Sequence, residues 1–462
     1  MNKYTLIPLI CVIFQLKSFV PLSGNNLDKI NMADTVRFPD WVKNGVIYEV
    51  NIRQFTPEGT LKAFEAHLFR LKNLGVDILW LMPVFPIGKV DRKGSMGSYY
   101  SVSDYHSINP DMGNMQDFDR LIAKAHALGF KVILDWVANH TAHDHNWVTD
   151  HPDFYLRDST GAPQIPVDNS GHPTDWTDVV DLDYNNQVMR DSMREAMMYW
   201  IDKHHIDGFR CDIAGFVPLD FWQSVRKELD KRGNYLFLGE CEESNYYNAF
   251  QVQYGWTYFH LWEDIAKGKR PASGIDTLVQ TDLSKNPANA LKMLFIDNHD
   301  ENSWNHTMQE RFGPGYKTFA VLAFTLPGIP LMYSGQESDL AKSLRFFEKD
   351  TINFGAFAST GFYHKLIELR HDNEALWSGT SGGDYTELCQ SQPTQVFAFR
   401  RKTANQEIMV IANLSQQETN VQWCPGQVNN AQYKDLMSGA SVELGESYQL
   451  TLKPWEYHIF IK

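Results

Sequence analysis

The chain has 462 residues and a formal net charge of −14, from 42 lysine and arginine residues against 56 aspartate and glutamate residues. This acidic balance repels phosphate backbones and makes nucleic acid a poor candidate partner. Hydrophobic residues make up 43% of the chain and charged residues 21%, which is typical of a globular protein and argues against disorder. The length allows about three domains, or one large barrel with an appended domain.

The N-terminal residues have the pattern of a signal peptide. Lys3 precedes an apolar stretch over residues 4–16, which is too short to span a bilayer and has the length of a signal-peptide core. We expect residues 1–24 to be a signal peptide and the protein to be exported, either periplasmic or secreted. The alternative is a merely apolar tail. No other run approaches the length of a membrane span, so we expect no integral membrane segment in the mature protein.

The cysteines give little information on their own. The chain has five, at positions 11, 211, 241, 389 and 424, with no CxxC motif and no close histidine spacing, which argues against a structural zinc site. Without a leader, four remain, too few for a disulfide framework in a chain of this length. A single bridge between Cys389 and Cys424 is one option that the spacing does not support by itself.

From residue 45 the chain alternates short apolar runs with amphipathic stretches. Helices are predicted over 61–74 and 116–128, where leucine and other apolar residues recur at spacings of three and four. Seven buried strands are predicted over 46–50, 76–82, 131–135, 208–213, 235–239, 291–296 and 329–333. An eighth would lie around 254–261, a segment that reads equally well as a helix. Such apolar runs separated by helices indicate a parallel sheet covered on both faces.

Two regions break this alternation and suggest additional domains. Residues 139–182 are rich in His, Asp, Pro and Gly, carry no helix signal, and are predicted to form an inserted domain after the third strand. After a helix over 363–370 the pattern alternates with a period of two, so residues 372–462 are predicted to form a C-terminal antiparallel β-sandwich. The remaining segments, 42–138 and 183–371, have the length of one (β/α)₈ TIM barrel.

Polar residues cluster where the predicted strands end. Active sites of such barrels lie at the C-terminal ends of the strands. Each polar residue there also has a structural explanation: Arg210 and Asp212 could be a plain ion pair, the acidic run from Glu240 could be a solvated loop, and the histidines could cap loops. Several carboxylates, an arginine and two histidines on one rim would be too costly for structure alone, so their co-occurrence favours a functional site. The strand ends that carry these polar residues are 135–140, 208–212, 238–240 and 295–300.

These segments resemble the α-amylase family of glycoside hydrolases. DWVANH, GFRCDIAG, LGE and FIDNHD are similar to the four signature regions of that family, in order and at the expected strand ends. Residues 97–105, 180–183 and 328–337 add further similarity, and the resemblance extends from about residue 42 to the C-terminus. It implies a TIM barrel with an inserted domain and a C-terminal β domain, acting on α-glucans without an organic cofactor.

The resemblance also implies roles for individual residues. Cleavage of an acetal with retention needs a carboxylate nucleophile and a protonated carboxylic acid about 5–5.5 Å apart. Asp212 matches the nucleophile, Glu240 the acid/base, and Asp300 the third carboxylate, which binds sugar hydroxyls. The residues that match substrate-binding positions are Tyr100, the stacking platform, Arg210, which would keep Asp212 ionised, and the hydroxyl donors His140 and His299.

Three glutamates near one another compete for the role of acid. Glu240 directly follows the fifth predicted strand, whereas Glu242 lies about 6–7 Å further along an extended chain and Glu243 has the opposite parity. We therefore expect only Glu240 to reach Asp212, with Gly239 leaving room for a sugar close to the backbone.

Departures from the family pattern affect metal binding and substrate preference. Asn139 and Asp181 match two ligands of a structural calcium ion, but Phe216 stands where calcium-binding amylases often have His, and Gly215 where Lys is common. A structural calcium ion is therefore an option rather than an expectation. Ser101 follows Tyr100 where many exo-glucosidases have Asp, which favours an open, endo-type site.

The predicted function is that of a retaining hydrolase that cleaves α-1,4-glucosidic bonds of starch-like glucans or maltooligosaccharides. An α-glucosidase, an α-1,6-active enzyme or a transglycosylase on the same barrel is the alternative, because the same carboxylates serve all of these. A second alternative is a non-catalytic carbohydrate-binding barrel, against which the presence of all three carboxylates argues.

Overall fold

The computed structural model describes residues 36–167 and 171–462. The predicted signal peptide and Cys11 therefore lie outside the described residues. Within the described part of the chain, no helix is both long enough and apolar enough to cross a membrane.

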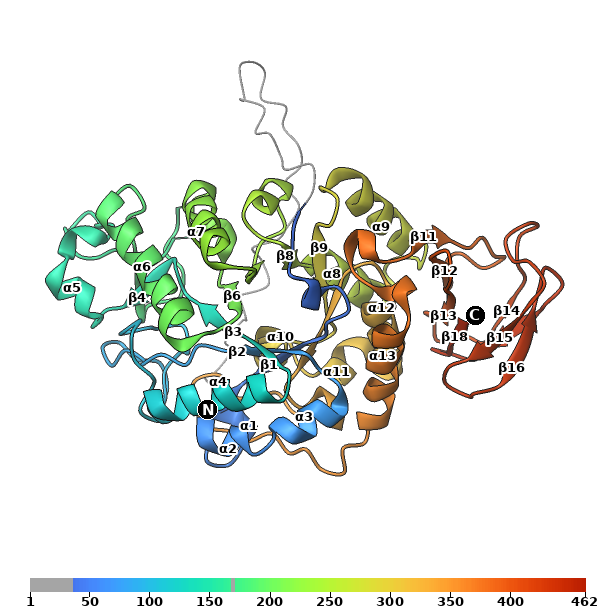
Figure 1. Cartoon of the computed structure of the whole chain (residues 1–462), viewed down its shortest axis with the longest axis horizontal. Helices are drawn as coiled ribbons and strands as arrows, with labels where there is room; N and C mark the ends of the chain where they lie inside the picture. The colour runs from blue at the N-terminus through green and yellow to red at the C-terminus, as the bar shows by residue number, and fades with distance from the viewer. Residues whose placement is uncertain (1–35, 168–170) are drawn as a thin grey trace, which may run out of the picture.

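Eight parallel strands close into a barrel in the order β1-β10-β9-β8-β7-β6-β3-β2 (Figure 1), which confirms the predicted barrel. Their burial on both faces matches the near-continuous apolar runs of the sequence. The strands are β1 (Ile47–Val50), β2 (Ile78–Leu81), β3 (Lys131–Trp136), β6 (Gly208–Cys211), β7 (Leu236–Gly239), β8 (Val252–Tyr254), β9 (Leu291–Leu294) and β10 (Ile329–Tyr333).

The eighth strand lies earlier in the chain than predicted. β8 ends at Tyr254, and most of the segment 254–261 belongs to the helix that starts at Trp256. The strand has three residues, and its central Gln253 is polar although fully buried, so it lacks the apolar run that marks the other strands.

Helices cover the outside of the barrel. The predicted helix over 61–74 is two helices, because the chain turns at Ala66 and His67; the second ends at Gly75, whose φ of 104° a side chain would not tolerate. The α-helices of the barrel are α1 (Ile52–Phe55), α2 (Leu61–Glu65), α3 (Leu68–Leu74), α4 (Met115–Ala127), α6 (Gln187–His204), α7 (Leu219–Arg232), α8 (Trp256–Ala266), α9 (Gly274–Lys285), α10 (His299–Trp304), α11 (Met308–Phe312), α12 (Tyr316–Thr325) and α13 (Thr360–Asp372).

The inserted segment after β3 contains a small antiparallel sheet. Strands β4 (His140–Ala142) and β5 (Val179–Asp181) pair with His140 opposite Asp181. A short helix, α5 (Asn146–Asp150), lies between them, which the sequence pattern did not predict; the His145 ring accepts a hydrogen bond from the Trp147 N–H at its start. This segment lies at the left edge of Figure 1, at the opposite end of the molecule from the C-terminal domain.

The C-terminal domain, in red in Figure 1, consists of two antiparallel sheets. The six-stranded sheet has the order β11-β12-β13-β18-β15-β16, and the two-stranded sheet pairs β14 with β17. The strands are β11 (Asp384–Glu387), β12 (Val396–Lys402), β13 (Glu407–Asn413), β14 (Thr419–Val421), β15 (Ala431–Asp435), β16 (Ser441–Leu444), β17 (Leu450–Leu452) and β18 (Tyr457–Ile461).

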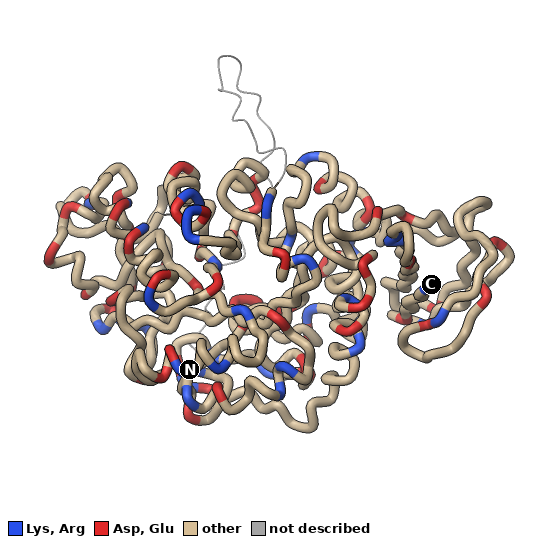
Figure 2. Tube along the Cα trace, in the orientation of Figure 1, with Lys and Arg blue, Asp and Glu red and all other residues tan. Residues whose placement is uncertain are grey.

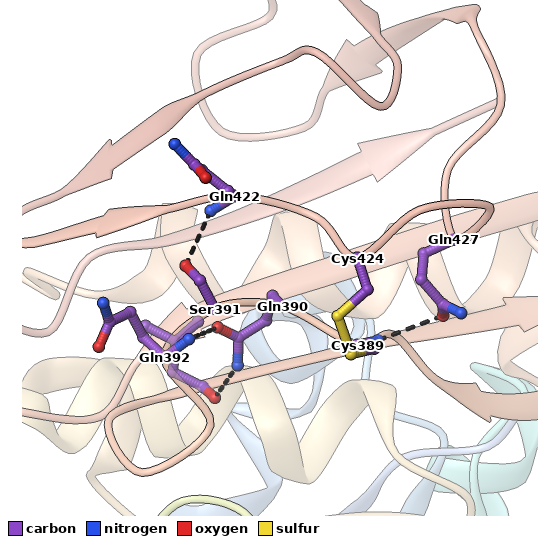
Figure 3. The surroundings of a disulfide bond; sticks show 8 residues. Cys389, Gln390, Ser391, Gln392, Gln422, Cys424 and Gln427 are labelled. Carbon is purple, nitrogen blue, oxygen red and sulfur yellow. Dashed lines mark hydrogen bonds between the residues drawn. A yellow bond between two sulfur atoms is a disulfide. The ribbon is translucent and has the colours of Figure 1, made fainter.

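One disulfide bond crosses this domain. Cys389 and Cys424 are bonded, with their Cα atoms 5.4 Å apart, and the side chain of Gln427 accepts a hydrogen bond from the Cys389 N–H (Figure 3). The bond links the segment before β12 to the segment after β14. The two other described cysteines, Cys211 and Cys241, are buried and reduced.

The two central strands of the C-terminal domain are buried on both faces. Phe397 and Val410 face the barrel and belong to its hydrophobic core, whereas Ala398 and Ile411 lie in a second core between the two sheets. Trp455 extends the contact, because its carbonyl accepts a hydrogen bond of 2.5 Å from the Thr318 hydroxyl on α12. The two domains therefore share one continuous apolar core.

Candidate active site

A buried arginine gathers three carboxylates at the C-terminal ends of the barrel strands. Acidic and basic residues are interspersed along the whole trace (Figure 2), but Arg210 on β6 is fully buried. Its Nη1 donates to Asp135 Oδ1 at 2.8 Å and to Asp212 Oδ1 at 2.9 Å, and its Nη2 donates to Glu240 Oε2 at 2.7 Å. Its Nε donates to the Tyr254 hydroxyl at 3.0 Å. A guanidinium carries five N–H donors in one plane, so a single arginine can hold several acceptors in fixed positions.

The strand register brings Asp212 and Glu240 together. Cys211 on β6 pairs with Gly239 on β7, so the residues that follow them leave the barrel side by side. The Ile213 N–H donates to Glu240 Oε2 at 2.8 Å, and Ile213 has a φ of 33°, which is strained for a β-branched residue. Such strain is characteristic of a functional turn, here one that aims an N–H at a carboxylate.

The neighbouring glutamates point elsewhere. Glu242 accepts a hydrogen bond from the Thr257 hydroxyl at 2.8 Å and lies 3.5 Å from the Lys292 ammonium, while Glu243 accepts from the Glu242 N–H. Of these three, only Glu240 contacts Arg210, as its place at the strand end predicts. The expectation for Gly239 is wrong: a Cβ there would lie 2.8 Å from the ring of Phe250, so the glycine makes room for that ring and not for a sugar.

A second network surrounds His299 at the start of α10. Its Nδ1 lies 2.5 Å from Glu49 Oε1, and its Nε2 lies 2.6 Å from the Tyr100 hydroxyl and 3.3 Å from Asp300 Oδ2. The Tyr100 hydroxyl in turn donates to Asp135 at 3.1 Å. This chain of contacts joins Asp300, the most exposed of the site carboxylates, to the carboxylates that Arg210 holds.

Burial and neighbouring charges shift the pKa values of Asp212, Glu240 and His299. Burial raises the pKa of Asp212 and of Glu240, and the Arg210 guanidinium opposes this in both. Because the two carboxyl groups share one cation they titrate as a pair, which favours one proton on the pair. Burial disfavours charge on His299, yet Asp300 and Glu49 raise its pKa to about 9. His299 is therefore a cation at neutral pH.

His140 lies on the opposite side of the site and is neutral. Burial lowers its pKa to about 4, and its ring lies 5.9 Å from that of Trp176 in the inserted segment. Of the predicted substrate-binding residues, Tyr100, Arg210 and His299 contact the site carboxylates directly, with Tyr100 9% exposed and His299 1% exposed.

The residues that match calcium ligands form a small cluster of their own. Asn139 Nδ2 donates to Asp181 Oδ1 at 2.9 Å, and burial raises the Asp181 pKa to about 7. Calcium takes six to eight oxygen ligands, usually with several carboxylates. Among the described residues, no group of three or more acidic, histidine or cysteine side chains converges on a point. Asp181 accepts a hydrogen bond from an amide N–H in this arrangement, and a calcium ion held by Asn139 and Asp181 stays an option rather than an expectation.

Sequence reasoning missed Glu49 and the roles of Asp135 and Tyr254. Asp135 is fully buried and accepts from Trp80 Nε1 at 3.1 Å as well as from Arg210 and Tyr100. Glu49 is fully buried on β1, and its Oε2 accepts no hydrogen bond from the described residues. An acidic residue inside the apolar run 46–50 was the available signal, since a buried carboxylate requires a partner.

Comparison with known proteins identifies the family. A model of the α-amylase catalytic domain matches residues 31–359, and a model of the maltogenic amylase C-terminal domain matches residues 386–459. The chain belongs to the α-amylase family. It is therefore a glycoside hydrolase of that family, and the carboxylates of the family pattern are all present and assembled at one end of the barrel.

Individual relatives of this α-amylase family member have different names. A noncanonic maltogenic α-amylase, AmyB, from Thermotoga neapolitana has 31% identity and a TM-score of 0.81, covering 91% of this chain and 99% of that one. The α-amylase MalA of Haloarcula japonica is 27% identical over 87% of this chain, which spans 59% of that relative. An oligo-1,6-glucosidase of Bacillus cereus is 21% identical over 91% of this chain and 99% of its own.

Proposed function

We propose that this protein hydrolyses α-1,4-glucosidic bonds of starch-like glucans or maltooligosaccharides with retention of configuration. The observation that carries the proposal is that one guanidinium, that of Arg210, bonds both Asp212 and Glu240. Carboxyl groups held by a single planar group fit the separation of about 5–5.5 Å in retaining glycosidases better than the separation of about 6.5–9.5 Å in inverting ones.

In the first step Asp212 acts as the nucleophile. Arg210 engages Oδ1, and Oδ2 accepts no hydrogen bond from the described residues, so Oδ2 can attack the anomeric carbon. Glu240 donates its proton to the glycosidic oxygen as that bond breaks. The N–H groups of Arg210 and Ile213 both bond Oε2 of Glu240, which leaves Oε1 to carry the proton. The products of this step are a glycosyl ester on Asp212 and a released saccharide whose former glycosidic oxygen is now a hydroxyl group.

In the second step Glu240, now ionised, takes a proton from water, and the water oxygen displaces Asp212 from the anomeric carbon. Asp300 and the cationic His299 bind hydroxyl groups of the reacting ring. Because hydrogen bonds to these hydroxyls strengthen as the ring flattens, Asp300 favours the oxocarbenium-like transition state. The sugar leaves with the same anomeric configuration with which it entered.

The decisive experiment follows the anomer that forms first from a maltooligosaccharide by proton NMR, together with reducing-sugar release. We expect the α-anomer to appear before mutarotation. Initial formation of the β-anomer would exclude the double displacement, and no release of reducing sugar would exclude glucan hydrolysis and favour a barrel that only binds carbohydrate.

A second candidate function is cleavage of α-1,6 bonds, because a relative aligned over nearly its whole length is named an oligo-1,6-glucosidase. The same carboxylates would serve that reaction or transfer to a second sugar. Panose contains both linkages, so its products separate the candidates: glucose plus isomaltose indicates α-1,4 cleavage, whereas glucose plus maltose indicates α-1,6 cleavage. Longer products would indicate transglycosylation.

Export of the protein is part of this proposal. The disulfide bond between Cys389 and Cys424 supports it, because such bonds persist in oxidising compartments and are rare in the cytosol. The apolar stretch behind Lys3 provides the signal. N-terminal sequencing of the protein from its host tests this: a mature chain that starts after Leu22 is expected, and a chain that keeps Met1 would contradict it.

A further inference from the structure

The loops that follow β2 and β10 are joined at the mouth of the barrel. The Met96 N–H donates to the Phe347 carbonyl at 3.0 Å, and the Ser95 N–H donates to Glu348 Oε1 at 3.0 Å. The Ser95 hydroxyl also donates to Glu348 Oε2. A Cβ on Gly94, whose φ is 61°, would lie 2.6 Å from the Cβ of Phe347. The two loops therefore meet backbone to backbone, with no room for a side chain between them.

Two basic residues fasten this contact. The buried Arg53 lies beneath it and donates from Nη1 to the carbonyls of Gly97 and Phe346, at 3.0 Å each. Lys93 lies beside it, with Nζ 3.6 Å from the Asp178 carboxylate and 5.7 Å from the centre of the Phe347 ring. Asp178 belongs to the inserted segment after β3. Loops from three strands are thus tied together on one side of the mouth.

The inner side of this junction is aromatic and continuous with the active site. The ring of Phe346 lies 6.3 Å from that of Tyr100 at an angle of 12°. Trp304 lies 5.2 Å from Phe346 and 5.6 Å from Phe347, and it ends the helix that begins with His299 and Asp300. Trp304, Phe346 and Phe347 are each partly exposed. Exposed rings next to a polar site suit the flat faces of sugars.

The order of the strands tells which end of a glucan meets this junction. In the closed barrel, β1 lies across from β7, and β2 and β10 are the two neighbours of β1. Glu240 follows β7, and the leaving sugar must lie beside the group that protonates it. The part of the glucan retained on Asp212 therefore extends away from β7, toward the joined loops.

We propose that residues 93–97 and 346–348 form a wall that ends the site on the glycone side, so that the enzyme removes short saccharides from the non-reducing end of a glucan. The inference rests on the proposed glucan hydrolysis and runs against the open, endo-type site that Ser101 suggested. With a wall at this place, an internal bond cannot reach Asp212, because the chain beyond it would pass through the joined loops.

The test compares two forms of maltoheptaose labelled at the reducing end, one free and one with a benzylidene group on the non-reducing glucose. We expect the free form to be hydrolysed at least tenfold faster, and its first labelled products to be one to three glucose units shorter, since the glucose, maltose or maltotriose released from the non-reducing end carries no label. Equal rates on the two forms would overturn the wall. Hydrolysis of neither form would instead refute glucan hydrolysis itself, so the two failures are distinguishable.

Variants locate the effect. Phe347→Ala combined with Lys93→Ala should reduce the ratio of the two rates to less than threefold, and Lys93→Gln alone should reduce it by a smaller factor without removing an apolar side chain. Phe69→Ala is the matched control, because Phe69 is 66% exposed on α3, away from the mouth. A wild-type ratio in folded Lys93→Gln and in the double variant would overturn the assignment of these residues.

Discussion

Two fully buried arginines lie at opposite ends of the barrel and have opposite surroundings. Arg210 at the catalytic end bonds three carboxylates. Arg370 on α13 lies where strands begin, and it donates to the Leu376 carbonyl at 2.6 Å, the Gly328 carbonyl at 3.1 Å and the Ser378 hydroxyl at 2.6 Å. Both are 0% exposed, so burial alone does not distinguish them.

The pKa values of the two arginines reflect the difference between charged and neutral hydrogen-bond partners. Burial lowers the pKa of Arg370 to about 9, because neutral acceptors offset little of the cost of burying a charge. Burial opposes the charge of Arg210 as well, but Asp135 and Glu240 raise its pKa well above the usual value. Arg370 therefore fastens backbone segments, whereas Arg210 sets the charge and position of carboxylates. In this barrel, the buried arginine with charged partners lies among the site carboxylates, and the one with neutral partners lies at the other end.

The largest effect is expected at the nucleophile. Asp212→Asn should lower kcat by several orders of magnitude, because an amide cannot form the glycosyl ester. The fold should remain intact, since Arg210 keeps two of its three carboxylates. Measurement of kcat on maltoheptaose and of the circular dichroism spectrum tests this, and a variant with a tenth of the wild-type activity would refute the role.

The acid should show a substrate-dependent loss. Glu240→Gln should lower turnover of maltooligosaccharides about 10²–10⁴-fold, the usual contribution of a general acid. Glycosyl fluorides need little protonation, so glycosylation by them should be largely retained, and azide should partly restore turnover. Glu242→Gln is the control, because it makes the same change of side chain two residues further along the chain. Azide rescue in that variant instead would place the acid at Glu242.

The two arginines should differ in how their loss depends on pH. Arg210→Met leaves buried carboxylates without a cation, so their pKa values rise further and stability is lost as the pH rises. Arg370→Met should cost about 1–3 kcal/mol for each buried acceptor left unpaired, equally at pH 5 and pH 8. Thermal unfolding at both pH values measures this. An equal loss of Tm at the two pH values in Arg210→Met would contradict the comparison.

A smaller effect is expected from replacing Glu49, which lies at the catalytic end of the barrel and contacts His299. The pKa of His299 in the folded protein is about 9, against the usual 6.5. Its charge therefore contributes stability that is complete below about pH 6.5 and lost as the pH rises through about 9. Glu49→Gln removes one of the two carboxylates that raise this pKa, so the loss should occur at lower pH. Tm from pH 6 to pH 10 tests this, with Glu242→Gln as control, and an unchanged midpoint would refute it.

Removal of metal should have the smallest effect. Because Asn139 satisfies Asp181, we expect chelation with EDTA to leave Tm and kcat unchanged within error, and added calcium to leave both unchanged as well. A fall in Tm on chelation that calcium reverses would show that Asn139 and Asp181 bind the ion together with further ligands.

The sequence predicts the part of the molecule that local pattern encodes. Seven strands appear as apolar runs, and the two carboxylates could be placed because Asp212 lies near the end of one run and Glu240 directly follows another. β8 could not, because its buried Gln253 interrupts the apolar pattern of a strand of three residues. The division between α2 and α3 also escaped, because the apolar spacing of 61–74 continues across the turn.

Contacts between distant positions account for the rest. Glu49 meets His299 across 250 residues, and no local spacing indicates such a pair. Arg53 donates to the carbonyl of Phe346, 293 residues away, so the joined loops cannot be inferred from either loop alone. The disulfide bond is similar, since its 35-residue spacing is compatible with many arrangements and only the sheet order brings the two cysteines together.

The burial of β12 and β13 on both faces bears on how such enzymes can be rebuilt. Removing the last ninety residues would expose Phe319 and its neighbours on α12. The barrel would then carry an exposed hydrophobic patch that promotes aggregation. Conversely, the C-terminal domain expressed alone would present Phe397 and Val410 to water. Chimaeras that exchange this domain between relatives should therefore also exchange α12. The two surfaces that pack against each other then come from the same protein.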